Sequence, residues 1–96
     1  MGLIELSWEN VNGKYLIKSF SFTDFLGALK FVNVCGEICE DQDHHAEFTL
    51  SWGDVTVKTW SHDTDSVTDR DTTLADAIDG AYSNCLLYTS DAADES

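Results

Sequence analysis

Basic residues are scarce in this chain of 96 residues: five Lys and Arg stand against eighteen Asp and Glu, giving a formal net charge of −13. Phosphate backbones and anionic membranes are bound largely through basic side chains, so a surface this acidic opposes both kinds of contact. We therefore expect no direct nucleic-acid partner and no membrane partner. The excess of acid is typical of a solubility adaptation, and an acidic surface for a protein partner is the alternative.

Long apolar runs are missing as well, since none approaches the roughly 20 residues that are needed to span a bilayer. Residues 1–5 have neither a basic start nor an apolar core, so they predict no signal peptide. Cysteine is sparse and odd in number: Cys35, Cys39 and Cys85. Cys35 and Cys39 share one apolar face of a predicted helix, which favours buried reduced thiols over a disulfide or a metal pair. Reduced thiols indicate the cytoplasm.

The remaining composition and pattern indicate one small α+β domain. A length of 96 residues and a hydrophobic content of 43% are ordinary for a single globular domain. The spacing of apolar residues predicts, in order, a strand at 15–22, a helix at 24–39, strands at 47–52 and 55–60, and a helix from 69. Hairpin strands pair antiparallel, so we expect an antiparallel sheet covered on one face by helices. The domain is expected to span residues 1–85, and residues 86–96 are expected to be a disordered or non-native tail.

Capping residues indicate where both helices begin. Thr23 is the predicted N-cap of the first helix, with Asp24 in its positive first turn. Thr68 and Asp71 form a capping box, with Asp in place of the usual Glu, that opens the second helix. Asp71 is accordingly interpreted as a helix-cap residue rather than a catalyst. The first helix ends in an acidic run, residues 37–43, which is notable because the helix dipole disfavours it.

The three histidines of the chain fall in two neighbouring places. His44 and His45 follow the acidic residues Glu40 and Asp43, and His62 lies at the outer end of the predicted hairpin. Strands joined by a short turn bring their outer ends side by side, so we expect the three imidazoles to line one pocket mouth. Histidine exchanges protons near neutral pH, which favours proton transfer. Zinc is the alternative, but adjacent histidines rarely reach one tetrahedral ion, and no HxxxH motif is present.

These residues resemble a known family, the pterin-4a-carbinolamine dehydratases. That family's signature is an acidic residue, three spacers, a His-His pair, an aromatic residue, a distant His and then an Asp. Here the matching positions are Glu40, His44, His45, Trp52, His62 and Asp71. Trp8 and residues 20–25 also fit the family pattern, and the resemblance covers about residues 8–82. The chain departs from the pattern at Ala46, where the family usually has proline, and at residues 63–66, where it usually has a smaller turn.

The resemblance implies an α+β enzyme that removes water from a 4a-hydroxytetrahydropterin to give quinonoid dihydropterin in tetrahydrobiopterin recycling. Such a reaction needs an acid for the 4a-hydroxyl group and a base for the proton on N5, and histidine suits both roles. By resemblance, His44 and His62 are the proton-transfer pair, and His45 completes the catalytic set mainly by holding the pterin. No metal and no cofactor is implied. The residues expected to bind the substrate are Glu40, Asp43, Trp60 and Asp63, with Trp52 as another candidate for an aromatic wall.

A second class of function stays open at this point. Some members of the family act as dimerisation cofactors for a homeodomain transcription factor, so the chain is alternatively a non-catalytic binding protein of the same fold. The presence of all three histidines favours the enzyme. Small sheets with exposed edges commonly pair across a two-fold axis, so we expect a homodimer or homotetramer.

Overall fold

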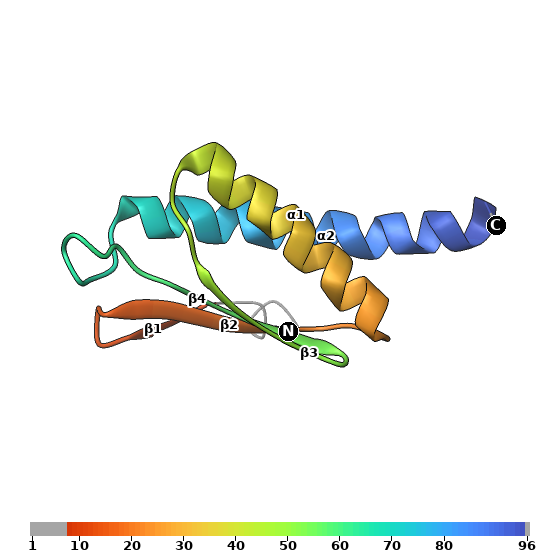
Figure 1. Cartoon of the computed structure of the whole chain (residues 1–96), viewed down its shortest axis with the longest axis horizontal. Helices are drawn as coiled ribbons and strands as arrows, with labels where there is room; N and C mark the ends of the chain where they lie inside the picture. The colour runs from red at the N-terminus through yellow and green to blue at the C-terminus, as the bar shows by residue number, and fades with distance from the viewer. Residues whose placement is uncertain (1–7, 96) are drawn as a thin grey trace.

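The computed structural model describes the backbone of residues 8–95 and the side chains of residues 8–84. Four antiparallel strands form one sheet in the order β1-β2-β4-β3, and two helices cover one of its faces (Figure 1). This architecture confirms the predicted α+β class. The elements are β1 (Glu9–Val11), β2 (Tyr15–Ser21), α1 (Phe25–Gln42), β3 (Glu47–Ser51), β4 (Asp54–Thr59) and α2 (Asp69–Glu95).

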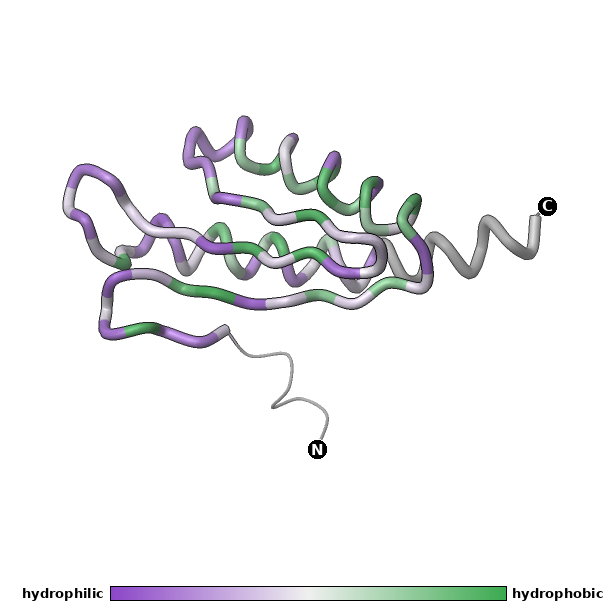
Figure 2. The backbone as a smooth tube through the Cα atoms, turned by 60° about the horizontal axis from the view of Figure 1, so that its bottom comes forward, coloured by the Kyte–Doolittle hydropathy of each residue, from purple (hydrophilic) through white to green (hydrophobic). Residues whose placement is uncertain are grey.

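The core lies between the sheet and the helices. Alternate residues of the two central strands, β2 and β4, are buried there, and Figure 2 shows hydrophobic stretches along the strands and α1 with hydrophilic turns between them. A strand contributes every second side chain to one face, so the predicted alternation is what places this set inward. The fully buried large side chains of the core include Phe20, Phe31, Val55, Val57, Leu74 and Ile78.

Two local predictions at the start of the chain need correction. Asp24, rather than Thr23, is the N-cap of α1, because its backbone is extended and its carboxylate accepts the N–H of Gly27 at 2.8 Å. The sequence also missed β1. This strand has only three residues, and the Asn12–Gly13 turn pairs it with β2. Such a short strand has no alternation to detect.

The hairpin and the last helix also differ in detail from the sequence expectation. Trp52 lies in the turn after β3 and is 69% exposed, so it does not continue the inward face of that strand. Helix α2 runs to Glu95, past the predicted domain end near residue 85. The side chains of residues 85–95 lie outside those described, so the nature of the tail stays a prediction.

An ion pair between a buried lysine and a partly exposed aspartate links the sheet to α2 at the edge of the core. Lys18 is 6% exposed on the inward face of β2, and its Nζ lies 2.7 Å from Oδ1 of Asp79. The indole N–H of Trp8 donates to the same oxygen at 3.0 Å. A buried ammonium needs such a partner because burial of an unpaired charge is costly. The pair therefore fixes how α2 lies over the strands.

Candidate active site

The end of α1 determines where the two adjacent histidines point. Asp43 is in the left-handed conformation (φ 55°), its N–H donates to the carbonyl of Glu40 at 3.2 Å, and the N–H of His44 donates to the carbonyl of Cys39 at 3.0 Å. This is a Schellman motif, which ends a helix and turns the chain sharply. As a result His44 is buried beneath the helix end, while His45 is exposed.

Asp71 lies opposite His44 and is completely buried. One carboxylate oxygen, Oδ1, lies 2.6 Å from Nε2 of His44 and accepts the hydroxyl of Thr59 at 2.6 Å. The other, Oδ2, accepts the hydroxyl of Ser61 at 2.8 Å and the backbone N–H of Thr68 at 2.9 Å. The last of these bonds confirms the predicted capping box. The carboxylate thus joins the start of α2, the end of β4 and the end of α1.

The charge of Asp71 is maintained by these donors. Burial acts to raise the pKa of this carboxyl group, but the hydrogen bonds from Thr59 and His44, followed by those from Thr68 and Ser61, lower the pKa below its usual value overall. A carboxylate that accepts several hydrogen bonds stays ionised even when it is buried. His44 therefore faces an anion.

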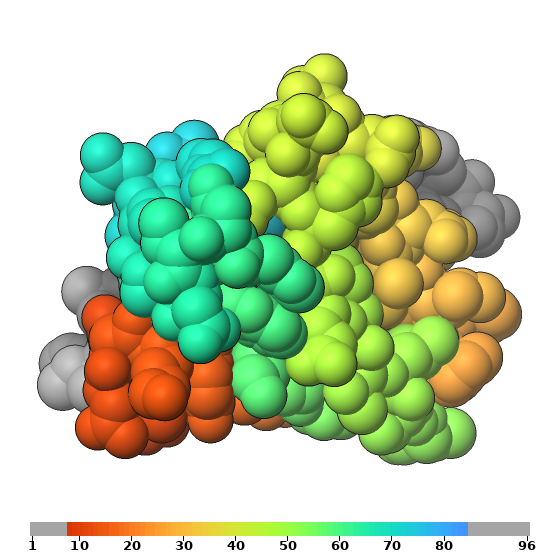
Figure 3. Space-filling model, turned by 60° about the vertical axis from the view of Figure 1, so that its left-hand side comes forward, coloured from red at the N-terminus to blue at the C-terminus, as the bar shows by residue number. Residues whose placement is uncertain are grey.

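A cleft of about 380 Å³ lies beside this pair, lined by Gln42, His44, Asp69, Arg70 and Thr73. That volume is within the usual range of roughly 300–1,000 Å³ for small-molecule sites. In Figure 3 the segment after β4 and the end of α1 approach each other across a small hollow on this side of the molecule. The cleft therefore gives a small ligand access to the region of His44.

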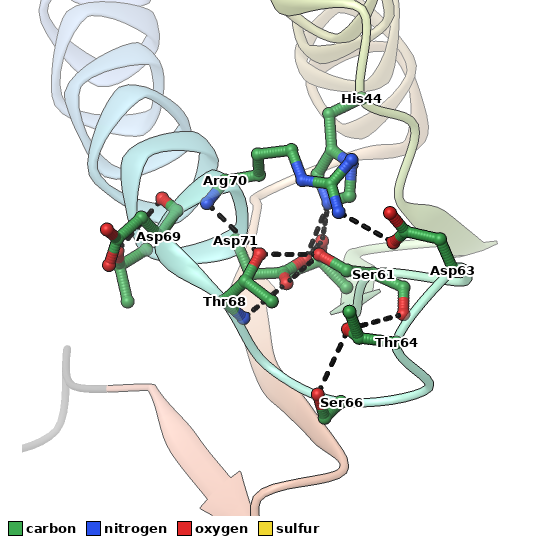
Figure 4. Close-up of polar contacts among 11 residues, drawn as sticks. His44, Ser61, Asp63, Thr64, Ser66, Thr68, Asp69, Arg70 and Asp71 are labelled. Atoms are coloured by element: carbon green, nitrogen blue, oxygen red, sulfur yellow. Dashed lines mark hydrogen bonds and ion pairs between the residues drawn. The ribbon is translucent and has the colours of Figure 1, made fainter.

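Arg70 reaches across the mouth of this region. Figure 4 shows its side chain passing beside His44 toward the loop after β4, where its Nη2 lies 2.6 Å from Oδ1 of Asp63. Both side chains are largely exposed, at 51% and 66%. The hydrogen bond from Arg70 lowers the pKa of the Asp63 carboxyl group. The predicted substrate-binding residue Asp63 therefore already has a partner within the protein.

The other two histidines have different partners. Nε2 of His45 lies 2.5 Å from Oε2 of Glu40, in an exposed pair, and the ring of His62 stacks on Trp60 at 4.6 Å between centroids. Along β4 the buried side faces the helices, and Thr59 and Ser61 hold these inward positions. Trp60 occupies the alternate position and faces the uncovered side, and the ring of His62, in the turn that follows, lies against it.

The structure thus brings each imidazole to a separate contact. Glu47 pairs with Lys58, so His45 and Trp60 lie just beyond the paired residues at the same end of the hairpin. His44 lies on the inward side, with Asp71. Within residues 8–84 no hydrogen bond or ring contact joins any two imidazoles, so their convergence on one pocket stays a prediction.

Sequence reasoning missed three residues that surround the His44–Asp71 pair: Thr59, Ser61 and Arg70. Two features of the sequence point toward these residues. The inward alternation of β4 continues through Ser61 after the strand ends, and the capping box fixes Asp71 at the first turn of α2. Neither signal shows that these two features meet, because the contact between the end of β4 and α2 is tertiary.

Neither the cysteines nor the other ionisable side chains form a second reactive site among the described residues. Cys35 and Cys39 are buried, as predicted, and burial raises the pKa of the Cys39 thiol, which keeps it protonated. The side chain of Cys85 lies outside those described. In the part of the chain that the structure describes, no three His, Cys, Asp or Glu side chains form a group that could hold a metal ion.

A larger cavity of about 560 Å³ lies on the helix layer, lined by residues of α1 and α2 that include Val34, Ile38, Ala77 and Ala81. Lys30 is the one ionisable residue among the described residues that line it. Acid–base chemistry depends on positioned ionisable side chains, and this lining offers one lysine without a carboxylate or imidazole beside it among the described residues. The smaller cleft beside His44 is therefore the better candidate for an active site.

A sequence profile of the family described as pterin 4 alpha carbinolamine dehydratase matches residues 2–81. The chain belongs to this family. A Rubrobacter xylanophilus protein, provisionally named a pterin-4-alpha-carbinolamine dehydratase, is 38% identical over 72 residues, which make up 75% of this chain and 67% of that protein. A Thermosynechococcus vestitus protein with the same provisional name is 39% identical over 71 residues, or 74% of each chain. The match covers about two thirds to three quarters of the length of these dehydratase relatives.

Known structures agree with the dehydratase fold. The crystal structure of a Brucella melitensis protein described as a transcriptional coactivator/pterin dehydratase has a TM-score of 0.74 and 29% identity, covering 78% of this chain and 81% of that one. A pterin dehydratase-like protein identified as a RuBisCO assembly factor in the alpha-carboxysome has a TM-score of 0.68 and 15% identity, covering 79% and 89%. This second likeness concerns the fold alone.

Proposed function

We propose that this chain is a dehydratase that removes water from a 4a-hydroxytetrahydropterin to give quinonoid dihydropterin, a step of tetrahydrobiopterin recycling. One observation carries the proposal: in a chain of the dehydratase family, a histidine paired with a buried carboxylate lies at the wall of a ligand-sized cleft. A histidine held by a carboxylate is a common arrangement for a general base.

The roles follow from the reaction and from the contacts. His44 is the proposed base for the proton on N5, and His62 is the proposed acid for the departing hydroxyl group. His45, oriented by Glu40, would hold the pterin. The ring of Trp60, stacked on His62, would fix the orientation of that imidazole. His44 lies on the inward side of the hairpin end, and His62 on the outward side. A bound pterin would therefore have to extend around that end to touch both.

Asp43 and Asp63 complete the proposed substrate-binding set at the rim. Asp43 lies at the turn between α1 and His44, and Asp63 is anchored by Arg70 at the opposite side. Their carboxylates could accept N–H groups of the pterin ring. In this proposal neither residue transfers a proton.

The test is a dehydration assay on a 4a-hydroxytetrahydropterin generated in situ, with the absorbance of quinonoid dihydropterin as the signal. Wild-type protein is expected to accelerate the reaction above its spontaneous rate. His44→Ala and His62→Ala are each expected to lower kcat by roughly 10²-fold or more, the usual contribution of a positioned acid or base. Asn33→Ala, an exposed change on α1, is the control and should keep the wild-type rate.

The outcomes separate the parts of the proposal. A wild-type protein that never exceeds the spontaneous rate contradicts the enzymatic function. A fully active His62→Ala variant removes His62 from the mechanism and leaves His44 in place. Circular dichroism and thermal unfolding of each variant show whether a lost rate reflects a lost fold.

A non-catalytic binding protein is the second candidate, because the Brucella relative is described as a coactivator as well as a dehydratase. Exposed apolar side chains on α1 would suit a partner surface: Phe25, Leu26 and Val34. Capture of a transcription-factor dimerisation segment by a protein that shows no turnover would favour this candidate. Turnover that depends on His44 would favour the enzyme.

Self-association and location belong to the same proposal. β1 and β3 form the two edges of the described sheet, and strand edges offer unpaired backbone groups to a second copy. We expect a homodimer or homotetramer, which sedimentation equilibrium would measure. The structure holds no helix that is long and apolar enough to cross a membrane among the residues described. Buried thiols are compatible with a reducing compartment, so the proposed location is the cytoplasm.

A further inference from the structure

The hydrogen bonds around Asp71 can be counted atom by atom. Oδ1 has two neighbours, Thr59 Oγ1 and His44 Nε2, and Oδ2 has two more, Ser61 Oγ and the backbone N–H of Thr68. An ionised carboxylate offers about four acceptor positions and no hydrogen of its own. All four positions are therefore filled, and every neighbour has to act as a donor.

The directions of the surrounding hydroxyl groups follow from this count (Figure 4). Ser61 gives its hydrogen to Asp71, so the hydroxyl of Thr68, 2.6 Å away, donates to Ser61. Thr59 also gives its single hydroxyl hydrogen to Asp71, so it has none left for the His44 ring at 3.5 Å. The ring nitrogen Nε2 of His44 must then carry a hydrogen, because Asp71 supplies none.

We propose that Asp71 is a positioning residue that holds His44 with its hydrogen on Nε2, so that Nδ1 is the atom that accepts the substrate proton. The role of Nδ1 as proton acceptor rests on the dehydratase function proposed above. The tautomer of His44 rests on the hydrogen bonds alone. A neutral imidazole has one donor and one acceptor nitrogen, and the partner of one nitrogen decides the role of the other.

The chemical step balances with His44 in this form. Nδ1 takes the proton from N5 of the pterin, and the electron pair of that N–H bond forms the C4a=N5 double bond. The electron pair of the C4a–O bond leaves with the hydroxyl oxygen, which takes a proton from the acid and departs as water. Asp71 remains ionised throughout and stabilises the imidazolium that forms on His44.

A purely structural role for Asp71 is the competing explanation, since the same carboxylate caps α2. Asp71→Asn separates the two roles. The amide oxygen can replace Oδ2 and still accept from Ser61 and Thr68, while the amide NH₂ group takes the place of Oδ1. That group would then donate to Nε2 of His44 and force the hydrogen onto Nδ1. The helix cap survives, but the accepting atom is blocked.

The first measurement is the tautomer of His44 by long-range ¹H–¹⁵N NMR of the full chain, at a pH where the ring is neutral, with His44→Gln used for assignment. We expect the Nε2–H form in the wild type and the Nδ1–H form in Asp71→Asn. A wild-type ring in the Nδ1–H form overturns the proposal, and this result needs no variant to fold. Thr59→Val keeps the carboxylate and should keep the wild-type tautomer.

The second measurement is the dehydration rate. With the fold intact, Asp71→Asn is expected to lower kcat by roughly 10²-fold or more, as happens when the same change reverses a catalytic histidine in serine proteases. Asp76→Asn, an exposed acid on the same helix, is the control and should keep the wild-type rate. Asp71→Asn with a reversed tautomer and an unchanged kcat overturns the positioning role. If no variant and no wild type shows turnover while the tautomers behave as expected, the proposed function fails and the placement of the His44 hydrogen stands.

Discussion

Nε2 of His44 lies 2.6 Å from Oδ1 of Asp71, a residue 27 positions further along the chain. The pair is buried and connects the end of α1 to the start of α2. The end of α1 and the start of α2 are thus both bonded to one ionised carboxylate. The stability of the protein should therefore depend on the charge of Asp71.

Acidification should weaken this connection. The pKa of Asp71 is lower in the folded chain than the ordinary value of 3.8, so its ionised form stabilises the fold above about pH 3.8. This contribution is lost as the pH falls through the lower folded-state pKa. We expect Asp71→Asn to cost about 2–3 kcal/mol of unfolding free energy at pH 7. The difference from wild type should shrink toward pH 2.5, as measured by urea unfolding.

Asp63→Asn provides the control for this experiment. The pKa of Asp63 is also lowered, through its hydrogen bond to Arg70, but both side chains are largely exposed. Solvent screens such pairs, so this variant should differ little from wild type at either pH. A difference for Asp71→Asn that stays constant from pH 7 to pH 2.5 would contradict the assigned charge.

Asp79→Ala should destabilise the protein more than Lys18→Met does. The first change takes the carboxylate from the buried Lys18 and also removes the acceptor of the Trp8 indole. We expect a loss of about 1–3 kcal/mol. Methionine fills the space of Lys18 without a charge, so that change should cost less than about 1 kcal/mol. Thermal unfolding compares them, with Asp76→Ala as the exposed control; equal losses would contradict the role of Asp79 in offsetting the burial of Lys18.

Two glycines should respond in opposite ways to alanine. Gly36 lies inside α1, and a Cβ there would meet nothing within 4 Å, so Gly36→Ala should stabilise the helix by about 0.5–1 kcal/mol. A Cβ on Gly53 would lie 2.9 Å from the carbonyl oxygen of Phe22. Gly53→Ala should therefore destabilise the hairpin by about 1–3 kcal/mol. Chemical unfolding at neutral pH measures both, and a stabilised Gly53→Ala variant would contradict the close approach.

Asp43→Gly separates helix capping from substrate binding. Glycine adopts the left-handed conformation freely, and the change removes a carboxylate from the negative end of α1. We expect a gain of about 0.3–1 kcal/mol in unfolding free energy. If Asp43 also binds the pterin, KM of the dehydration should rise several-fold while kcat changes little. An unchanged KM would limit Asp43 to its capping role.

The sequence by itself determined the family, the order of the main elements and the side of each strand that is buried. These follow from residue spacing, as in the alternation that puts Val55, Val57 and Thr59 under the helices. The capping box of Thr68 and Asp71 was also local, because its partners are three residues apart. Local spacing failed at element ends, as at Asp24, Trp52 and the end of α2, and at β1, a strand too short to show an alternating pattern.

Only the tertiary structure decided which groups surround each histidine. Two adjacent histidines look equivalent in a sequence, yet the left-handed Asp43 turns His44 inward and leaves His45 exposed. Asp71 became the partner of His44 because α2 packs across the end of β4, a contact between residues far apart in the chain. Proton-transfer chemistry depends on such distances, and spacing along the chain does not fix them.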